Sequence, residues 1–205
     1  MMFVTTLFAA SLATSALGWP IFPLPCSSIS GTPCSCPFGT DYTESVTTAI
    51  IGADAADVGF VANDFFDTAW TGNEPWMVQG PDNVPVFSIR DMNESTAVGD
   101  YVFRQRLTFR LEYPDGSFEQ RYEQTGNIPY YSGNGSFSGL WVTLKGDRIF
   151  QNQTLFRYSS YSCETGHPRN YAMFREMALN NVTTILQAAN MIHGFSTIPT
   201  SAQSF

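Results

Sequence analysis

The sequence contains few positively charged residues, and this shortage excludes several kinds of partner. Its 205 residues contain 10 lysines and arginines against 18 aspartates and glutamates, which gives a net charge of −8, and Lys145 is the only lysine. Nucleic-acid binding needs clustered lysines and arginines to neutralise phosphates, and anionic membrane surfaces make the same demand. We therefore expect neither a nucleic acid nor a membrane surface among the partners of this protein.

Histidine and the standard catalytic motifs are also scarce. His167 and His193 are the only histidines, which excludes a metal site rich in histidine. The sequence has no glycine-rich phosphate loop, no H-E-x-x-H motif and no G-x-S-x-G motif. We therefore expect neither a metal nor an organic cofactor.

The apolar run at the N-terminus is typical of a secretory signal peptide. Apolar residues between Leu7 and Leu12 are followed by Ala16-Leu17-Gly18, which places small residues at the two positions that a signal peptidase reads. This run is too short to anchor the chain in a membrane, and no later stretch is long enough for membrane insertion. We assign residues 1–18 to a signal peptide and expect a protein that is secreted or held in the lumen of the secretory pathway.

Sequons for N-glycosylation fit the same compartment. Asn93, Asn134 and Asn152 lie in polar, turn-like contexts, and we predict that they carry glycans. A fourth sequon, at Asn181, lies inside a predicted helix, and we expect it to remain unused.

Four cysteines in an exported chain predict two disulfides. Cys34 and Cys36 are too close in sequence to favour a bond with each other, so one of them is expected to pair with Cys26 and the other with Cys163. The sequence does not decide which of the two reaches Cys163. A metal site that uses the Cys34-x-Cys36 pair is the alternative, and oxidising export disfavours it.

The periodicity of apolar residues divides the rest of the chain into three parts. Residues 19–40 form an arm rich in cysteine and proline, residues 41–194 form one domain, and residues 195–205 form a polar tail. Within the domain, strand-like residues 42–51 precede a helix that begins after Asp54. Alternation of period two then runs from Val84 to Cys163, which predicts antiparallel strands.

The charges predict how the clearest hairpin pairs. Tyr113-Pro114-Asp115-Gly116 is a strong reversal signal between residues 101–112 and 117–124. Pairing that opposes Arg110 to Glu119 and Arg106 to Glu123 is favourable, whereas a two-residue slip opposes like charges. In this register the face with aromatic and glutamine side chains looks inward.

The last long segment, residues 170–193, is predicted to be a helix of about six turns. Its expected buried stripe holds Phe174, Ala178, Val182 and Ile185 among others, as in a helix that lies along a core. Arg175 interrupts this stripe about 60° from its centre.

The order of strand, helix, antiparallel strands and long C-terminal helix resembles the helix-grip architecture of the START/Bet v 1/polyketide-cyclase (SRPBCC) superfamily. The segment Ile51–Phe66, IGADAADVGFVANDFF, with Trp70 after it, is similar to the opening of those proteins. The resemblance covers about residues 41–193 and implies an α+β fold in which a curved antiparallel sheet grips the C-terminal helix. The chain also resembles secreted fungal tailoring proteins of secondary metabolism, such as the ketosteroid-isomerase-like proteins of maleidride pathways.

The resemblance implies a cavity between sheet and helix that holds a hydrophobic small molecule. Four residues are the candidate catalytic groups: Arg175, Arg157, Tyr122 and His167. Arg175 could bind a carboxylate or enolate oxygen, or its head could reach water while its stem covers the core. Arg157 could point inward on the last strand, although Phe156 and Tyr158 argue for the opposite face.

Tyr122 and His167 are the candidates for proton transfer, and each has a structural alternative. Tyr122 belongs to a polar set on the inward face, which could orient a ligand or could simply be bonded within itself. His167 precedes the long helix, where it could be a base or an exposed loop residue. The predicted ligand-binding residues are Tyr101, Phe103, Gln105, Gln120, Gln124 and Tyr161.

Two functions follow from these residues. The first is a cofactor-independent isomerase, cyclase or dehydratase that acts on a hydrophobic, oxygenated small molecule in secondary metabolism of polyketide type. The second is a secreted carrier that binds an apolar ligand without reaction. The sequence leaves the oligomeric state open.

Overall fold

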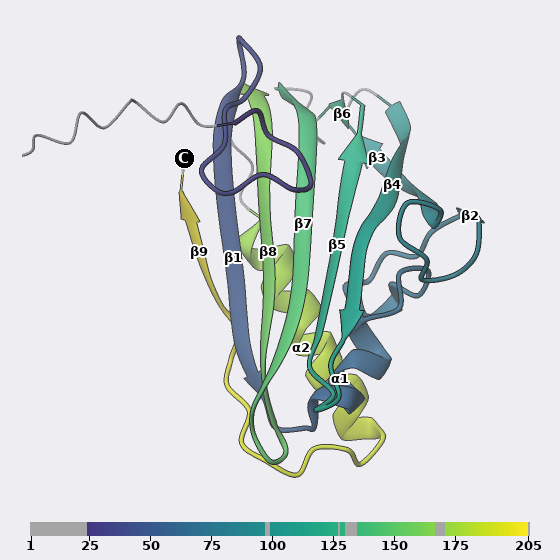
Figure 1. The fold of residues 1–205 in the computed structure, drawn as a ribbon, viewed down its shortest axis with the longest axis vertical. Coiled ribbons are helices and arrows are strands. Elements are labelled where there is room, and N and C mark those ends of the chain that lie inside the picture. Colours follow the sequence, from purple (N-terminus) through teal and green to yellow (C-terminus); the bar gives the residue numbers. More distant parts are fainter. Residues whose placement is uncertain (1–23, 97–98, 127, 130–134, 167–170, 205) are drawn as a thin grey trace, which may run out of the picture.

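The computed structural model describes residues 24–96, 99–126, 128–129, 135–166 and 171–204. One antiparallel sheet runs through this part of the chain, and it wraps around a long C-terminal helix (Figure 1). The predicted fold class, an α+β helix-grip fold, is confirmed. In spatial order the strands are β2 (Met77–Gln79), β3 (Ile89–Thr96), β4 (Gly99–Glu112), β5 (Phe118–Thr125), β7 (Gly135–Phe150), β8 (Gln153–Gly166), β1 (Asp41–Ile51) and β9 (Thr200–Ser204). The short β6 (Ile128–Pro129) pairs with β7 off this path.

Helices occupy one face of the sheet. They are α1 (Ala55–Ala62), the short 3-10 helix η1 (Ala69–Thr71) and α2 (Ala172–Ala188). Helix α2 crosses the sheet on the face opposite to the N-terminal arm (Figure 1). None of the described helices is long and apolar enough to cross a membrane.

Helix α2 is shorter than predicted, and its buried face is rotated. Its buried residues are Arg175, Ala178, Leu179, Val182 and Leu186. Phe174 and Ile185, which were expected in the buried stripe, are 39% and 41% exposed. On a wheel of about 100° per residue the observed stripe is centred on Arg175, which is therefore buried under the helix instead of lying at the edge of its apolar arc.

The predicted hairpin register is wrong beyond Leu107, because β4 contains a β-bulge there. Arg106 faces Glu123 as expected, but the register shifts between Leu107 and Phe109, so Arg110 lies opposite Gln120 instead of Glu119. Beyond the bulge the side chains change faces, which is the usual effect of one extra residue in a strand. Phe109 is therefore partly exposed, contrary to the alternation that placed it inside.

Gly146 and Asp147 lie within β7, and the chain turns after Phe150, at residues 151–152. Gly146 serves close packing: a Cβ atom there would lie 2.3 Å from the ring of Phe118. Asn152, a predicted glycosylation site, occupies the actual turn with a left-handed φ of 56°.

The segment predicted as a polar tail contains a strand. Residues Thr200–Ser204 form β9, which pairs with β1 at the sheet edge. The domain therefore extends past the predicted boundary at residue 194. The sequence pattern missed β9 because its alternation carries small and polar residues instead of apolar ones.

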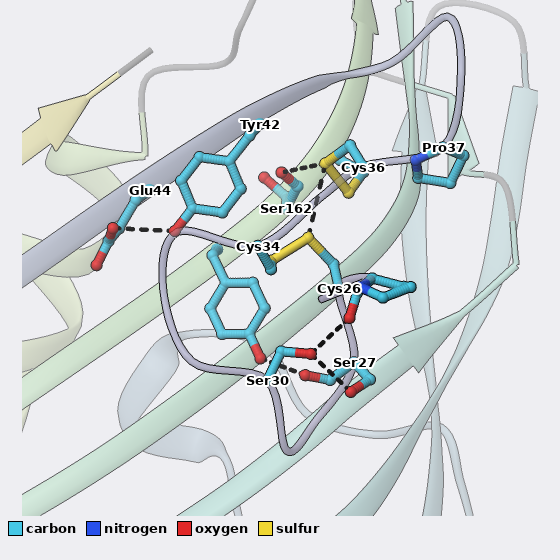
Figure 2. Close-up of a disulfide and its surroundings, with 12 residues drawn as sticks. Cys26, Ser27, Ser30, Cys34, Cys36, Pro37, Tyr42, Glu44 and Ser162 are labelled. Atoms are coloured by element: carbon cyan, nitrogen blue, oxygen red, sulfur yellow. Dashed lines mark hydrogen bonds between the residues drawn. A yellow bond between two sulfur atoms is a disulfide. The ribbon is translucent and has the colours of Figure 1, made fainter. Parts of the chain in front are cut away.

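The arm lies across the outer face of the sheet, and one disulfide holds it there. Cys26 bonds Cys34, and Cys36 bonds Cys163 in β8. Figure 2 shows Cys36 beside the Cys26–Cys34 bond and next to Ser162. The pairing left open by the sequence thus has Cys36 as the link to the sheet, and the bonded sulfurs are not available for the alternative metal site.

The two disulfides are compatible with an exported protein. The predicted signal peptide, residues 1–18, lies outside the described residues, as does Asn134. Asn93 is exposed on β3 and remains a predicted glycosylation site. The amide of Asn181 donates a hydrogen bond of 3.1 Å to the carbonyl oxygen of Trp70. The expectation that this sequon is unused remains a prediction.

The disulfides should differ in their effect on stability because they close loops of different lengths. Cys36 and Cys163 are separated by 127 positions, and Cys26 and Cys34 by 8. We expect the double substitution Cys36→Ala/Cys163→Ala to lower the free energy of unfolding by about 2–5 kcal/mol, measured by urea denaturation. Cys26→Ala/Cys34→Ala is the matched control and should cost less; equal losses would contradict this account.

Candidate functional site

A cavity of about 440 Å³ lies between the start of α2 and the concave face of the sheet. Its size is within the range usual for small-molecule sites. Residues from β3, β4, β5, β7, β8, η1 and α2 contribute to the wall, which is largely aromatic and aliphatic with several polar groups. The lining residues are Thr68, Thr71, Asn73, Arg90, Met92, Phe103, Gln105, Tyr122, Gln124, Phe137, Leu140, Val142, Tyr158, Tyr171, Met173, Phe174 and Arg175.

Arg175 points into this interior and not to water. The residue is 2% exposed. Its Nη1 donates a hydrogen bond of 3.2 Å to the carbonyl oxygen of Ser45, and its Nη2 donates one to Oγ of Ser160. The guanidinium carbon lies 5.0 Å from the ring centre of Tyr158 and 4.9 Å from that of Tyr171. Burial lowers the pKa of Arg175 below its usual value.

A second buried arginine, Arg90 on β3, was missed by the sequence analysis. Its Nε donates a hydrogen bond of 2.7 Å to Oε1 of Gln105, and its Nη1 donates one of 2.6 Å to the carbonyl oxygen of Phe65. Its guanidinium carbon lies 4.3 Å from the ring centre of Phe65 and 4.6 Å from that of Tyr122. Burial lowers the pKa of Arg90 as well. Arg90 could have been identified only from the pairing of β3 with β4, which places it opposite the inward-facing Gln105. The sequence pattern does not show this pairing.

A pair of tyrosines lies between the two arginines. The hydroxyl groups of Tyr122 and Tyr158 are 3.1 Å apart and share a hydrogen bond. Arg90 lies over the ring of Tyr122, and Arg175 lies over the ring of Tyr158. Burial, followed by the neighbouring Tyr158, raises the pKa of Tyr122 well above its usual value of 10.0. The Tyr122 phenol therefore stays neutral and keeps its proton at physiological pH.

The predicted glutamine set divides into two groups. Gln105 and Gln124 face each other across β4 and β5 and line the cavity. The buried Nε2 of Gln124 has no hydrogen-bond partner in the described part of the chain. Gln120, by contrast, does not line the cavity. Its amide donates a hydrogen bond of 3.0 Å to the carbonyl oxygen of Asn63, at the end of α1.

Arg157 and Tyr161 lie on the opposite side of β8 from the cavity. The strand alternates so that Phe156, Tyr158 and Ser160 are buried, which turns both predicted residues toward the outer face. Arg157 forms an ion pair with Asp147. The predictions that place Arg157 and Tyr161 at the site are therefore wrong, because at their positions on β8 the side chains point away from the cavity.

The outer face has its own role for Tyr161. Its ring stacks on that of Trp141 with centres 5.3 Å apart, and its hydroxyl donates a hydrogen bond to the carbonyl oxygen of Ser27 in the arm. Among the other predictions, Phe103 lines the cavity. His167 lies outside the described residues, as does the side chain of Tyr101.

Comparisons with known proteins agree with this geometry. A family model described as a START domain matches residues 42–202. A search of curated proteins found no match. Among solved structures, a protein from Rhizobium leguminosarum superposes with a TM-score of 0.51 at 14% identity, over 73% of this chain and 97% of that chain. Norcoclaurine synthase from Thalictrum flavum, in complex with dopamine and hydroxybenzaldehyde, gives a TM-score of 0.51 at 8% identity, over 73% and 89%. At these identities the superpositions show the fold alone.

The raised pKa of Tyr122 predicts a specific loss of stability at high pH. An unfolded phenol ionises near pH 10, whereas the folded one does not, so stability is complete below that pH and falls as the pH rises above it. We expect Tyr122→Phe to reduce this fall in the free energy of unfolding between about pH 9 and pH 11, measured by denaturant titration. Tyr113→Phe, at the exposed hairpin turn, should retain the wild-type fall. Identical slopes for Tyr122→Phe and wild type would contradict the prediction.

Proposed function

The chain belongs to the START domain family, and from this premise we propose that its cavity binds a hydrophobic, oxygenated small molecule and catalyses its isomerisation, cyclisation or dehydration without a metal or an organic cofactor. One observation carries the proposal. Two buried guanidinium groups, those of Arg90 and Arg175, flank the Tyr122–Tyr158 pair on the wall of a single cavity. Such a group of donors suits a substrate whose carbonyl oxygen gains negative charge during the reaction.

The chemical roles follow from the positions of these groups. Arg175 and Arg90 would stabilise an enolate oxygen. This electrostatic stabilisation is stronger in a buried site because water is excluded. Tyr122, whose phenol is protonated at physiological pH, would donate a proton to the carbon or oxygen that accepts it, with Tyr158 holding its hydroxyl in place. His167 precedes the lining residue Tyr171 by four positions, and it remains our candidate for the base that removes a proton from the substrate.

The aromatic wall would fold the substrate around these polar groups. Phe103, Phe137 and Phe174 supply flat apolar surface on three different elements. We further propose that the protein works in or beyond the secretory pathway, in secondary metabolism of polyketide type. The predicted signal peptide, the two disulfides and the resemblance to secreted fungal tailoring proteins support this setting.

A non-catalytic carrier is the second candidate, and one observation favours it. The described lining residues include two arginines and three tyrosines but no aspartate, glutamate or histidine that could act as an ordinary base. If His167 is not near the cavity, proton abstraction has no conventional agent, and the same walls would serve to bind and release a ligand unchanged.

Turnover in variants separates the two functions. The purified protein would be incubated with candidate oxygenated polyketide-type compounds, and products would be followed by mass spectrometry. We expect Arg175→Ala to lower kcat by about 10²–10³-fold because an oxyanion donor is lost. Tyr122→Phe should lower it by about 10²–10⁴-fold because a proton donor is lost.

Two variants serve as controls for this experiment. Phe103→Leu should bind the substrate less tightly but keep most of kcat, and Arg121→Gln, on the outer face of β5, should behave as wild type. Binding of a compound, seen by native mass spectrometry, without conversion of any candidate would favour the carrier and defeat the enzyme proposal.

A further inference from the structure

The charges inside the cavity are strongly one-sided. Among the described lining residues, Arg90 and Arg175 are the charged groups, and there is no aspartate or glutamate to oppose them. Both are almost completely buried, with exposures of 4% and 2%. A buried charge without a partner costs free energy, so paired or metal-bound charges are the rule in protein interiors.

The other described arginines of the molecule differ from these two in having carboxylate partners. Of the eight arginines that the structure describes, six form ion pairs with carboxylates. The exceptions are Arg90 and Arg175, the two that face the cavity. Among the described residues, the six arginines outside the cavity are thus paired with carboxylates, whereas the two buried arginines are not.

The partners of these two arginines are neutral. Carbonyl, hydroxyl and amide oxygens accept their hydrogen bonds, and tyrosine or phenylalanine rings cover their faces. Glu164 is a buried carboxylate on the inward side of β8, but it accepts a hydrogen bond from Ser162, forms no ion pair with Arg175 and does not line the cavity. The two guanidinium groups are therefore solvated by dipoles, and neither forms an ion pair with a carboxylate of the described residues. Glu164 and Asp64 act on Arg175 and Arg90 only from longer range.

Gln124 adds an unused donor to the same wall. It is 5% exposed and lines the cavity, and its Nε2 has no partner in the described structure. It lies directly opposite Gln105, whose Oε1 accepts a hydrogen bond from Arg90. A buried amide NH₂ without an acceptor is costly, and a ligand oxygen is the group that would satisfy it.

We propose that the ligand of this cavity is an acid, an apolar molecule with a permanently ionised carboxylate that serves as the missing counter-ion for Arg90 and Arg175. This inference rests on the proposed function and narrows its substrate class from oxygenated molecules in general to carboxylic acids. An enolate forms only during the reaction, so it would oppose this positive charge only transiently. A ligand that is anionic at rest opposes the positive charge of the cavity as soon as it binds, and the planar fork of a guanidinium matches a carboxylate. An amine of the same shape would bring a third positive charge into the same space.

The test compares three compounds that share a skeleton and differ in charge: naphthylacetate, naphthylethanol and naphthylethylamine. Each would compete with phenylnaphthylamine, a neutral fluorescent probe, for the full-length secreted protein. We expect the acid to displace the probe at a concentration about tenfold lower than the alcohol, as a charged hydrogen bond predicts, and the amine to be the weakest.

Variants assign this preference to the two arginines. Arg90→Gln and Arg175→Gln should each remove most of the advantage of the acid over the alcohol while the probe still binds, and Arg121→Gln should leave the advantage intact. Because Arg175→Gln could disturb folding through its contacts with β1 and β8, Arg90→Gln on β3 provides an independent result. Circular dichroism would confirm that each variant is folded.

The outcomes distinguish this inference from the proposed function. Binding of the probe with equal competition by acid, alcohol and amine would overturn the acid-ligand inference and leave an apolar binding cavity standing. A preference for the acid that survives both arginine substitutions would overturn it as well. A wild-type protein that binds neither the probe nor any of the three compounds would overturn the proposed function and this inference together.

Discussion

Much of this structure depends on the burial of two guanidinium groups, those of Arg175 and Arg90, at the wall of one cavity. A charged side chain in the interior must find oxygen atoms to replace water. Strands β1 and β8 supply them for Arg175 through the carbonyl of Ser45 and the hydroxyl of Ser160. The loop after α1 and strand β4 supply them for Arg90 through Phe65 and Gln105. These contacts join α2 to β1 and β8, and they join β3 to β4 and to the loop after α1.

The two faces of the sheet therefore have different roles. The concave face carries the arginines, the tyrosine pair and the aromatic wall of the cavity. The convex face carries ion pairs such as Arg106–Glu123 and the stacked rings of Trp141 and Tyr161, and it receives the arm. Strict alternation along β5 and β8 keeps these two sets of side chains apart, because successive residues point to opposite faces of a strand. Where alternation is interrupted, at the bulge after Leu107, the exposed and buried sides exchange.

The sequence was sufficient for the architecture and for part of the site. The order of elements predicted the helix-grip fold, and an arginine within an apolar stripe drew attention to Arg175. Strand parity was the main obstacle to the rest. Nothing in residues 153–166 alone decides whether Arg157 or Tyr158 faces the helix, and a single bulge moves residues such as Phe109 to the other face. Arg90 and β9 were harder still, since a short polar segment gains its place from strand pairing and not from its own hydrophobic pattern.

The bond between Cys36 and Cys163 has a consequence for how a ligand reaches the interior. Cys163 lies three residues after Ser160, on the strand that also carries Tyr158, so the crosslink fastens this wall of the cavity to the arm behind it. We therefore do not expect a ligand to enter through the β8 side of the cavity. The opposite rim, at the first turn of α2, carries Met173 and Phe174, which are 81% and 39% exposed. The crosslink therefore fastens the β8 side of the cavity to the arm, and the exposed lining side chains lie on the α2 side.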